Sequence, residues 1–275
     1  MANTKAGSSK SNLSRLEAWD PMLFVDEEPT PSCLMRVTRD IAEIQANPLP
    51  GIFISPEEVD LTRIHAIVVG PAGTPYEGGF FQFFIKCPAN YPIVPPRVRL
   101  MTTDAGRVCF NPNLYANGKV CLSILGTWTG PAWSPVQSVG TVLISIQSLM
   151  NEEPIYNEPG MTCTSVTSTQ YNDKVRHDTI RVAVCDAVEA CLLKEPPYPP
   201  YLVDAILKTF AETYDKYEER VKALVEQNSS SWRLSRIFGL VSTYEYAPLL
   251  ERLRQLVQRV KGKMEADGAA EAQKQ

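Results

Sequence analysis

A cysteine and an asparagine lie close together in the part of the chain best suited to chemistry. Cys121 follows Gly118 by three positions, and Asn113 precedes it by eight. A sulfur that carries an acyl group must be reached by a bulky donor and later by an acceptor amine, and a loop gives that access better than a helix interior. The residue types therefore indicate acyl transfer through Cys121. From the loop alone a packed thiol is the commoner outcome, and Asn-Pro-Asn at 111–113 is typical of a turn.

An acyl-carrying thiol must also be kept from a general base, because a base would activate water and the thioester would be lost. The chain has two histidines. His65 falls in an expected strand and His177 in an expected helix, and neither is near Cys121 in sequence. A cysteine hydrolase with a Cys–His pair is therefore disfavoured.

Asn113 supplies a neutral NH2 group, which can donate to the oxyanion formed when an amine attacks the thioester. One such donor is typically worth about 2.7–4 kcal/mol of the barrier. The nucleophile itself is the thiolate, which is usefully populated when its pKa is near or below about 8.5. Lys119 is close in sequence. We expect modest activation of the thiol, with rate gained chiefly by positioning.

A helix and four strands are predicted before this loop. Residues 32–46 place their apolar side chains on one helical face, namely Leu34, Val37, Ile41 and Ile44. Segments rich in β-branched and aromatic residues predict strands at 51–55, 63–69, 79–86 and 97–101. Proline- and glycine-rich turns separate them, so we expect an antiparallel meander. A loop as long as 102–133 is usually functional in a compact domain.

The rest of the chain is predicted to be helical. Ser134 and Pro135 are suited to cap a helix, and Pro154 stops it. Further helices are expected at 172–193, 201–227 and 246–264, with a stiff proline-rich linker at 195–200 and a break at 228–231. This order is typical of the α+β class. We expect a flexible segment at 1–31, a catalytic core at 32–194, a helical C-terminal extension at 195–264 and a disordered tail at 265–275.

Composition excludes several classes of protein. A net charge of -4 over 275 residues gives no basic footprint for nucleic acid, and no apolar run is long enough for a membrane span or a signal peptide. The seven cysteines are odd in number and form no CxxC pair, which argues against a disulfide framework or a zinc site. We therefore expect a protein of the reducing cytoplasm or nucleus, with no nucleic-acid or membrane partner.

The loop around Cys121 resembles the signature of ubiquitin-conjugating enzymes, in which His-Pro-Asn is followed by Asn-Gly and then by Cys-Leu. The residues at the family's spacing are Asn113, Asn117, Gly118, Cys121 and Leu122. Other family features occur in the right order: the turn around 70–80, the proline loop at 91–96, and Trp-Ser-Pro at 133–135. The resemblance covers roughly residues 32–160 and implies the α+β UBC fold.

Three departures from the family pattern affect the site. Asn111 stands where most members have the histidine that braces the loop, so the loop geometry is expected to differ. Ser123 stands where many have aspartate, which removes an acid near the incoming lysine. Residues 127–132 include an insertion relative to compact members, which enlarges the lip of the active site.

The resemblance assigns roles to individual residues. Cys121 would be the nucleophile and thioester carrier, and Asn113 the oxyanion donor or a brace of the loop. Glu158 resembles an acidic gate that orients the lysine or accepts its proton, with help from Tyr156 and Asn157. A solvated loop carboxylate is the alternative for Glu158.

Two further sets of residues match the family's docking positions. Arg36 and Arg39 on the first helix match the positions that engage the activating enzyme, although a solvated basic face is the commoner meaning of such a pattern. Ile93 and Val136 match the two ligase-binding loops, and each could equally plug the core.

The resemblance implies an enzyme that accepts ubiquitin or a ubiquitin-like modifier from an activating enzyme and transfers it to a substrate lysine, usually with a ubiquitin ligase. It implies no cofactor and no metal. The lengthened lip and helical extension resemble one subgroup, whose members use modifier-activating enzyme 6 and accept a tandem ubiquitin-like modifier. The alternative is a non-catalytic scaffold of the same fold that binds partners of the ubiquitin pathway. Such scaffolds typically lack the cysteine.

Overall fold

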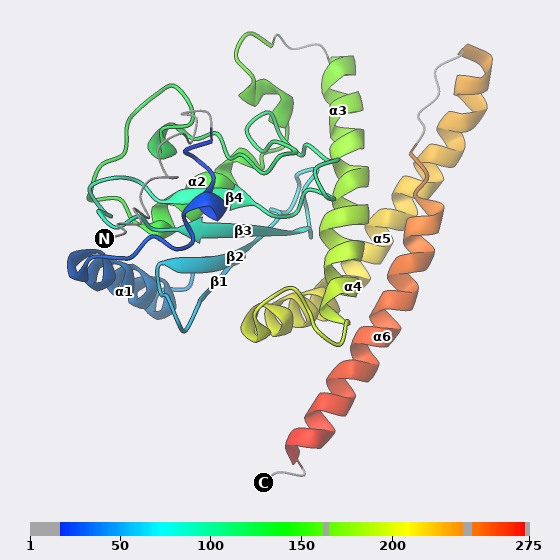
Figure 1. Ribbon diagram of the computed structural model, residues 1–275. Coiled ribbons are helices and arrows are strands. Elements are labelled where there is room, and N and C mark those ends of the chain that lie inside the picture. Colours follow the sequence, from blue (N-terminus) through cyan, green and yellow to red (C-terminus); the bar gives the residue numbers. More distant parts are fainter. Residues whose placement is uncertain (1–16, 162–164, 239–243, 273–275) are drawn as a thin grey trace, which may run out of the picture.

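The computed structural model describes residues 17–161, 165–238 and 244–272, with the backbone alone at 165–167, 228–238 and 270–272. Figure 1 shows the sheet with two helices on one side of the molecule and a group of C-terminal helices on the other. The strands are β1 Ile52–Pro56, β2 Arg63–Val69, β3 Phe80–Lys86 and β4 Arg97–Leu100. The α-helices are α1 Pro31–Ala46, α2 Val139–Leu149, α3 Ser165–Asp178, α4 Ala187–Cys191, α5 Pro200–Phe238 and α6 Ala247–Ala272. Shorter helices are η1 Pro21–Phe24, η2 Ser123–Leu125, η3 Pro154–Asn157 and the π-helix η4 Thr179–Asp186.

The four strands form one antiparallel sheet in the order β1-β2-β3-β4. Each predicted strand agrees with an observed one to within a residue at either end. The prediction succeeds because β-branched and aromatic runs alternate with turns that proline and glycine favour. The predicted α+β class and the meander are therefore confirmed.

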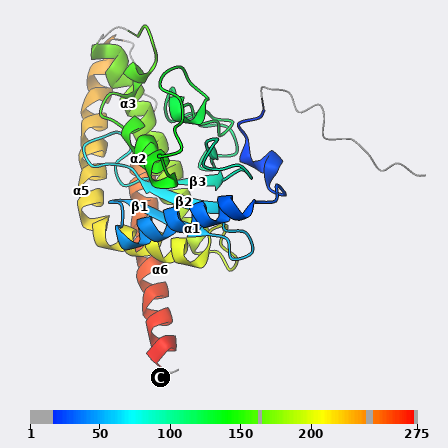
Figure 2. The same cartoon turned by 90° about the vertical axis from the view of Figure 1, so that its left-hand side faces the viewer.

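The two faces of the sheet belong to two different apolar cores, because successive side chains of a strand point to opposite faces. Ile64, Ala66 and Val68 of β2 lie in the inner core with apolar residues of α1 and α2. Ile67 of β2 and Phe80 of β3 lie in the outer core with residues of η4, α4, α5 and α6. The C-terminal helices thus cover part of the outer face, and α6 runs on beyond them to the C-terminus (Figure 2).

The predicted start of α2 at Ser134 is wrong. The helix begins at Val139, where Ser138 is the N-cap and forms a capping box with Thr141. Helical pairing would direct the carbonyl of Pro135 to the N–H of Val139. That carbonyl accepts a bond from Arg36 Nη1 instead, at 2.6 Å. The missed contact comes from a residue far away in sequence, which the local pattern could not reveal.

The C-terminal helices also differ from prediction. The helix expected at 172–193 starts at Ser165 and includes the π-helix before α4 ends at Cys191. The break expected at 228–231 is wrong, because α5 continues to Phe238. The last helix reaches Ala272, so the predicted tail is helical over 265–272, and its last residues, 273–275, lie outside the described part. The division into a core at 32–194 and an extension at 195–264 stays a prediction.

Residues 17–29, here called the N-terminal strap, pack against the outer face of the sheet at the end away from the C-terminal helices. The guanidinium of Arg97 lies 3.7 Å from the ring centre of Phe24, and Arg63 donates two bonds to the carbonyl of Val25, at 2.9 and 2.6 Å. Arg99 pairs with Asp20. Residues 17–29 therefore have defined partners on the sheet, the flexibility predicted for 1–31 stays a prediction, and residues 1–16 lie outside the described part.

No helix in the described part of the chain is long and apolar enough to cross a membrane.

Candidate active site

Cys121 is held by Asn113 through both of its backbone polar groups. The Cys121 N–H donates to the Asn113 carbonyl at 2.8 Å, and Asn113 Nδ2 donates to the Cys121 carbonyl at 3.1 Å. Asn113 is therefore placed as a brace of the loop. An amide NH2 has two hydrogens, so the same group can hold the loop and still offer one hydrogen to an oxyanion. The acceptor Oδ1 of Asn113 is buried and has no hydrogen-bond partner among the described residues.

Asn111 occupies the centre of a buried amide network. Its Nδ2 donates to Tyr76 Oη at 3.0 Å and to the Leu149 carbonyl at 2.8 Å. Its Oδ1 accepts from the backbone N–H of Asn113 at 2.8 Å and from Asn157 Nδ2 at 3.3 Å. The network ties the catalytic loop to the end of α2 and to η3. Asparagine at this position therefore braces the loop, the work that the family histidine was expected to do.

The sulfur of Cys121 is covered in this conformation. The residue is 2% exposed, so the expectation of an open thiol is wrong here. Cys121 is nevertheless part of neither apolar core. The groups that act on its sulfur are polar: the hydroxyl of Tyr115, the ammonium of Lys119 and the carboxylate of Glu158. The thiol is therefore covered, but its surroundings are polar and charged and differ from those of a core cysteine.

The same surroundings decide the protonation state of the thiol. Burial is the largest influence and raises the pKa of Cys121. The positive charge of Lys119 and a hydrogen bond from Tyr115 lower this pKa, and the negative charge of Glu158 raises it. The net direction is upward, so the expectation of modest activation is wrong for the resting state. Positioning is left as the main source of rate.

Glu158 lies close enough to Cys121 for its charge to act on the thiol, and its role as a gate stays a prediction. It follows η3, its side chain is exposed, and its charge raises the pKa values of both Cys121 and Tyr115. The preceding residue, Asn157, fixes this segment. Its Nδ2 donates to the Leu149 carbonyl at 3.0 Å, and its Oδ1 accepts from Asn151 at 2.9 Å. The carboxylate is therefore carried by a fixed backbone. Tyr156 is partly buried.

Arg36 and Arg39 have different surroundings, although the sequence treats them alike. Arg36 binds the carboxylate of Asp40 at 2.7 Å and the carbonyls of Pro135 and Gln137 at 2.6 and 2.5 Å. Its guanidinium thus ties α1 to the chain before α2. Arg39 is exposed. Only Arg39 presents the open basic surface that was predicted for both.

Ile93 and Val136 are both on the surface, 73% and 83% exposed, as docking residues must be. Their loops are joined, because Trp133 Nε1 donates to the Pro92 carbonyl at 2.7 Å. Met35 of α1 is 75% exposed and follows a residue of the apolar stripe. Met35 was not among the predicted docking residues. Its place beside the apolar stripe, and not in it, was the sign in the sequence that its side chain is exposed.

The two histidines have partners away from the catalytic loop. His65 Nε2 lies 3.1 Å from Glu57 Oε1, and the ring of His177 packs against Tyr246 at 5.6 Å between centroids. Among the described residues, no three side chains of His, Cys, Asp or Glu gather to hold a metal ion. The contacts of both histidines therefore agree with the argument against a Cys–His hydrolase.

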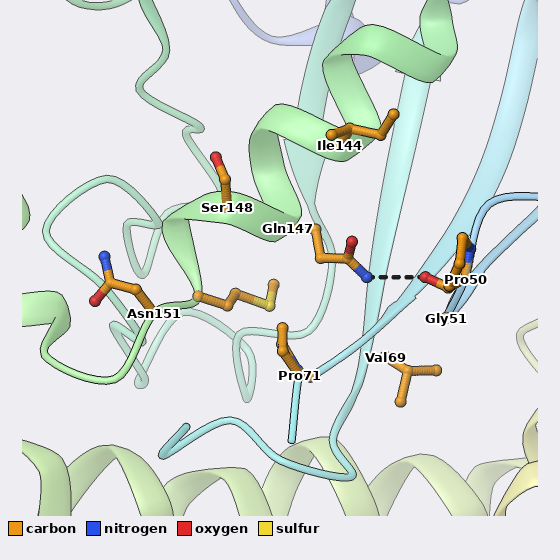
Figure 3. Close-up of a pocket in the computed structure, with 10 residues that line it drawn as sticks. Pro50, Gly51, Val69, Pro71, Ile144, Gln147, Ser148 and Asn151 are labelled. Atoms are coloured by element: carbon orange, nitrogen blue, oxygen red, sulfur yellow. Dashed lines mark hydrogen bonds between the residues drawn. The ribbon is translucent and has the colours of Figure 1, made fainter. Parts of the chain in front are cut away.

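A shallow groove of about 590 Å³ lies between the end of α2 and the start of β1 (Figure 3). Ile144, Val69 and Pro71 give it an apolar lining, and Gln147 bridges it by donating to the Pro50 carbonyl at 3.0 Å. Cys121 is not among the residues that line it. The groove is therefore separate from the loop that holds Cys121.

Comparisons with known proteins agree with this geometry. The family model described as Ubiquitin-conjugating enzyme matches residues 36–184. The chain is 49% identical to Ubiquitin-conjugating enzyme E2 Z of Homo sapiens over 260 residues, which are 92% of this chain and 72% of that protein. It is 48% identical to the protein of the same name from Xenopus tropicalis, over 92% of this chain and 81% of that protein. A more distant relative is the human Dual E2 ubiquitin-conjugating enzyme/E3 ubiquitin-protein ligase BIRC6, 37% identical over 68% of this chain and 4% of that protein.

Proposed function

The chain belongs to the ubiquitin-conjugating enzyme family, and from that premise we propose that Cys121 is the residue that carries the modifier as a thioester. The observation that supports this assignment best is the pair of hydrogen bonds between Asn113 and the backbone of Cys121. It fixes the one cysteine at the family's spacing in a braced loop. Cys121 is therefore preferred to Cys109, which is exposed on the same stretch.

Loading is an exchange of thioesters. The thiolate of Cys121 attacks the carbonyl carbon of the activating enzyme's thioester, and the thiolate of that enzyme leaves. One thioester is broken and one is formed, so the step is nearly isoenergetic, and the proton lost by Cys121 is balanced by the one that the leaving sulfur gains. Because the pKa of Cys121 is raised, little thiolate is present at rest. Loading therefore requires the thiol, which is 2% exposed at rest, to become accessible and to lose its proton.

Discharge is an aminolysis. The neutral amine of a lysine attacks the thioester carbonyl, the C–S bond breaks, and the amine loses a proton as the thiolate leaves. Glu158, whose charge acts on the thiol, would orient the lysine or accept that proton. The second hydrogen of the Asn113 amide would stabilise the oxyanion, a contribution of about 2.7–4 kcal/mol to the barrier.

Members of this family receive their modifier from an activating enzyme and work with ubiquitin ligases, and the surface of this chain offers a place for each. We assign Arg39 to the activating-enzyme interface, because it is exposed on α1. Ile93, Val136 and Met35 form the ligase-binding face, because they are exposed apolar residues on joined elements.

The finer choice of partner rests on resemblance. Several vertebrate relatives share the name Ubiquitin-conjugating enzyme E2 Z and are 46–49% identical to this chain. We therefore propose modifier-activating enzyme 6 as the activating enzyme, and both ubiquitin and a tandem ubiquitin-like modifier as cargo. We also propose a cytoplasmic and nuclear location, with no nucleic-acid or membrane partner.

A loading assay tests the function. The protein is incubated with activating enzyme, ATP and ubiquitin, and then run on non-reducing gels. We expect an adduct that thiol reagents cleave, that Cys121→Ala abolishes and that Cys121→Ser converts to a thiol-resistant oxyester. Cys109→Ala is the matched control and should load normally. No adduct with either modifier and either of two activating enzymes would instead favour the non-catalytic scaffold.

The same assay separates the two arginines. Arg39→Glu should slow loading in a protein of normal stability, because only a surface charge is reversed. Arg36→Met should lower the unfolding temperature, because it leaves Asp40 buried without its ion partner. Unchanged loading by Arg39→Glu would remove this residue from the interface.

A further inference from the structure

The chain through Cys121 is a short extended segment with two distinct edges. Leu122 has the extended angles φ -136° and ψ 141°, and Val120 pairs with Leu114 in an isolated antiparallel bridge. In extended backbone the polar groups of successive residues point to opposite edges. Cys121 therefore faces one edge, where Asn113 binds it, and Val120 and Leu122 face the other.

One hydroxyl group occupies that second edge. Thr127 Oγ1 donates to the carbonyl of Val120 at 2.6 Å and accepts from the N–H of Leu122 at 3.0 Å. The Leu122 carbonyl lies 3.2 Å from the same oxygen. A hydroxyl has one hydrogen and two lone pairs. It therefore donates its hydrogen to the nearer carbonyl, that of Val120, and accepts from the N–H of Leu122. Thr127 thus satisfies a donor and an acceptor that flank the nucleophile.

A tight turn returns the chain so that Thr127 reaches this edge. The carbonyl of Leu122 accepts from the N–H of Leu125 at 3.1 Å and from the N–H of Thr127 at 3.2 Å. Gly126 has φ +68°, a left-handed conformation that glycine adopts without the strain of a side chain. The lip of the site therefore begins with a closed turn that delivers the hydroxyl to the nucleophile's segment.

We propose that Thr127 is a positioning residue for the sulfur of Cys121. It holds one edge of the segment through Cys121, as Asn113 holds the other edge. With Asn113 alone, the segment is held along one edge and the sulfur can swing about it. With both edges bonded, the direction of the thiol is fixed. This inference rests on the proposed role of Cys121 as the thioester carrier.

Two substitutions test the hydroxyl. Thr127→Val keeps the shape and removes the hydrogen bonds, and Thr127→Ser keeps the hydroxyl. Thr129→Val, an exposed threonine of the same lip, is the matched control. Each variant is loaded with ubiquitin, separated from the activating enzyme, and discharged onto free lysine in single-turnover reactions at several lysine concentrations.

We expect the maximal rate of discharge to fall while the apparent affinity for lysine stays the same. Thr127→Val should lower the maximal rate constant of discharge about tenfold, since small misplacements of reacting atoms are costly, and leave the half-saturating lysine concentration unchanged. Thr127→Ser and Thr129→Val should match the wild type. Discharge by Thr127→Val within twofold of wild type, or an equal loss in Thr127→Ser, would overturn the proposal.

A second variant covers the case in which Thr127→Val does not fold. Gly126→Ala keeps the hydroxyl but strains the turn that delivers it, and an added Cβ would meet no atom within 4 Å. It should also slow discharge, and wild-type discharge by this variant would count against the proposal. Failure of the proposed function is distinct, because the wild-type protein would then form no thioester at all.

Discussion

The side-chain amide of Asn113 carries two hydrogens, and the contact with the Cys121 carbonyl accounts for one of them. The resemblance to the family left two roles open, oxyanion donor and brace. The geometry supports the brace directly and leaves the second hydrogen for the oxyanion. The two roles affect different measurements, because a brace acts on both transfer steps and an oxyanion donor in aminolysis acts chiefly on discharge.

Asn113→Ala is expected to slow both steps, and discharge more than loading. Loss of the brace should cost about 0.5–1.5 kcal/mol of stability and loosen the thiol, whereas loss of an oxyanion donor should slow discharge about 10²–10³-fold. Loading and discharge rates are measured on the same preparation, with the unfolding temperature as control. Equal losses in the two rates would leave Asn113 as a brace alone.

Glu158→Gln should have opposite effects on the thiol and on lysine transfer. The negative charge of Glu158 raises the pKa of Cys121, so its removal lowers that pKa and increases the thiolate fraction at any pH below it. Alkylation of Cys121 at pH 7 should become about threefold faster, the effect of a charge at short range near a surface. Discharge onto lysine should become slower, because the gate is lost.

Mass spectrometry of Cys121 alkylated by iodoacetamide between pH 7 and 10 measures the first effect. Glu152→Gln, an exposed carboxylate six residues before Glu158 in the chain, is the control. Slower alkylation in Glu158→Gln, or faster discharge, would contradict the gate.

The sequence could nominate Cys121 as the nucleophile, which stays a proposal, but it could not predict that the thiol is buried. The spacing of Asn113, Gly118 and Cys121 indicated the loop. The thiol is 2% exposed, and its pKa depends partly on the charge of Glu158, which α2 and η3 separate from Cys121 in the chain. Arg36 shows the same limit, because the partners that remove it from the surface, Pro135 and Gln137, lie far along the chain.

Among the elements, the N-terminal strap has the least support from sequence and a definite place in the fold. Its aromatic and acidic side chains pair with arginines on the outward-facing positions of β4. One of these, Arg99, also packs against the catalytic loop, where a Cβ on Gly118 would come within 2.9 Å of Arg99 Cγ. The strap therefore holds Arg99 in place, and Arg99 in turn packs against the turn at Gly118, before Cys121.

Phe24→Ala should release the strap. It removes the ring that lies 3.7 Å from the guanidinium of Arg97, a contact worth about 0.5–2 kcal/mol. Hydrogen exchange over residues 17–29 should become faster, and exchange over the turn at 117–119 should rise with it. Met22→Ala, which truncates an exposed side chain of the same strap, is the control. Unchanged exchange in Phe24→Ala would mean that other contacts hold the strap.

Local patterns predicted elements well where residue type alone decides the backbone. The strands followed from β-branched residues and turns, and α1 from its apolar stripe with Pro31 at the first turn. The start of α2 and the continuation of α5 past 228 depend on contacts and context beyond any local window. The strap could not be placed from the sequence because its composition is that of a loosely ordered segment, and the partners of its aromatic residues are arginines of a distant strand.

At the scale of the whole molecule, the sheet is shared between two cores. Ile67 and Phe80 belong to the outer core with the C-terminal helices, while their neighbours in the same strands belong to the inner core. The helices expected to form a separate extension are therefore packed on the strands that build the catalytic part. A loss of packing in α6 should be transmitted through β2 and β3, so the chain should unfold as one cooperative unit.

Leu253→Ala tests this coupling, because Leu253 of α6 is fully buried in the outer core. The truncation should lower the free energy of unfolding by about 2–5 kcal/mol. Urea unfolding is followed by far-ultraviolet circular dichroism, dominated by helices, and by fluorescence in a Trp232→Phe background, where the remaining tryptophans lie in the N-terminal strap and the catalytic part. Both transitions should shift together, and Leu193→Ala, at an exposed leucine, should shift neither. A dichroism transition that moves to lower urea while the fluorescence transition stays in place would show that the helices unfold independently of the catalytic core.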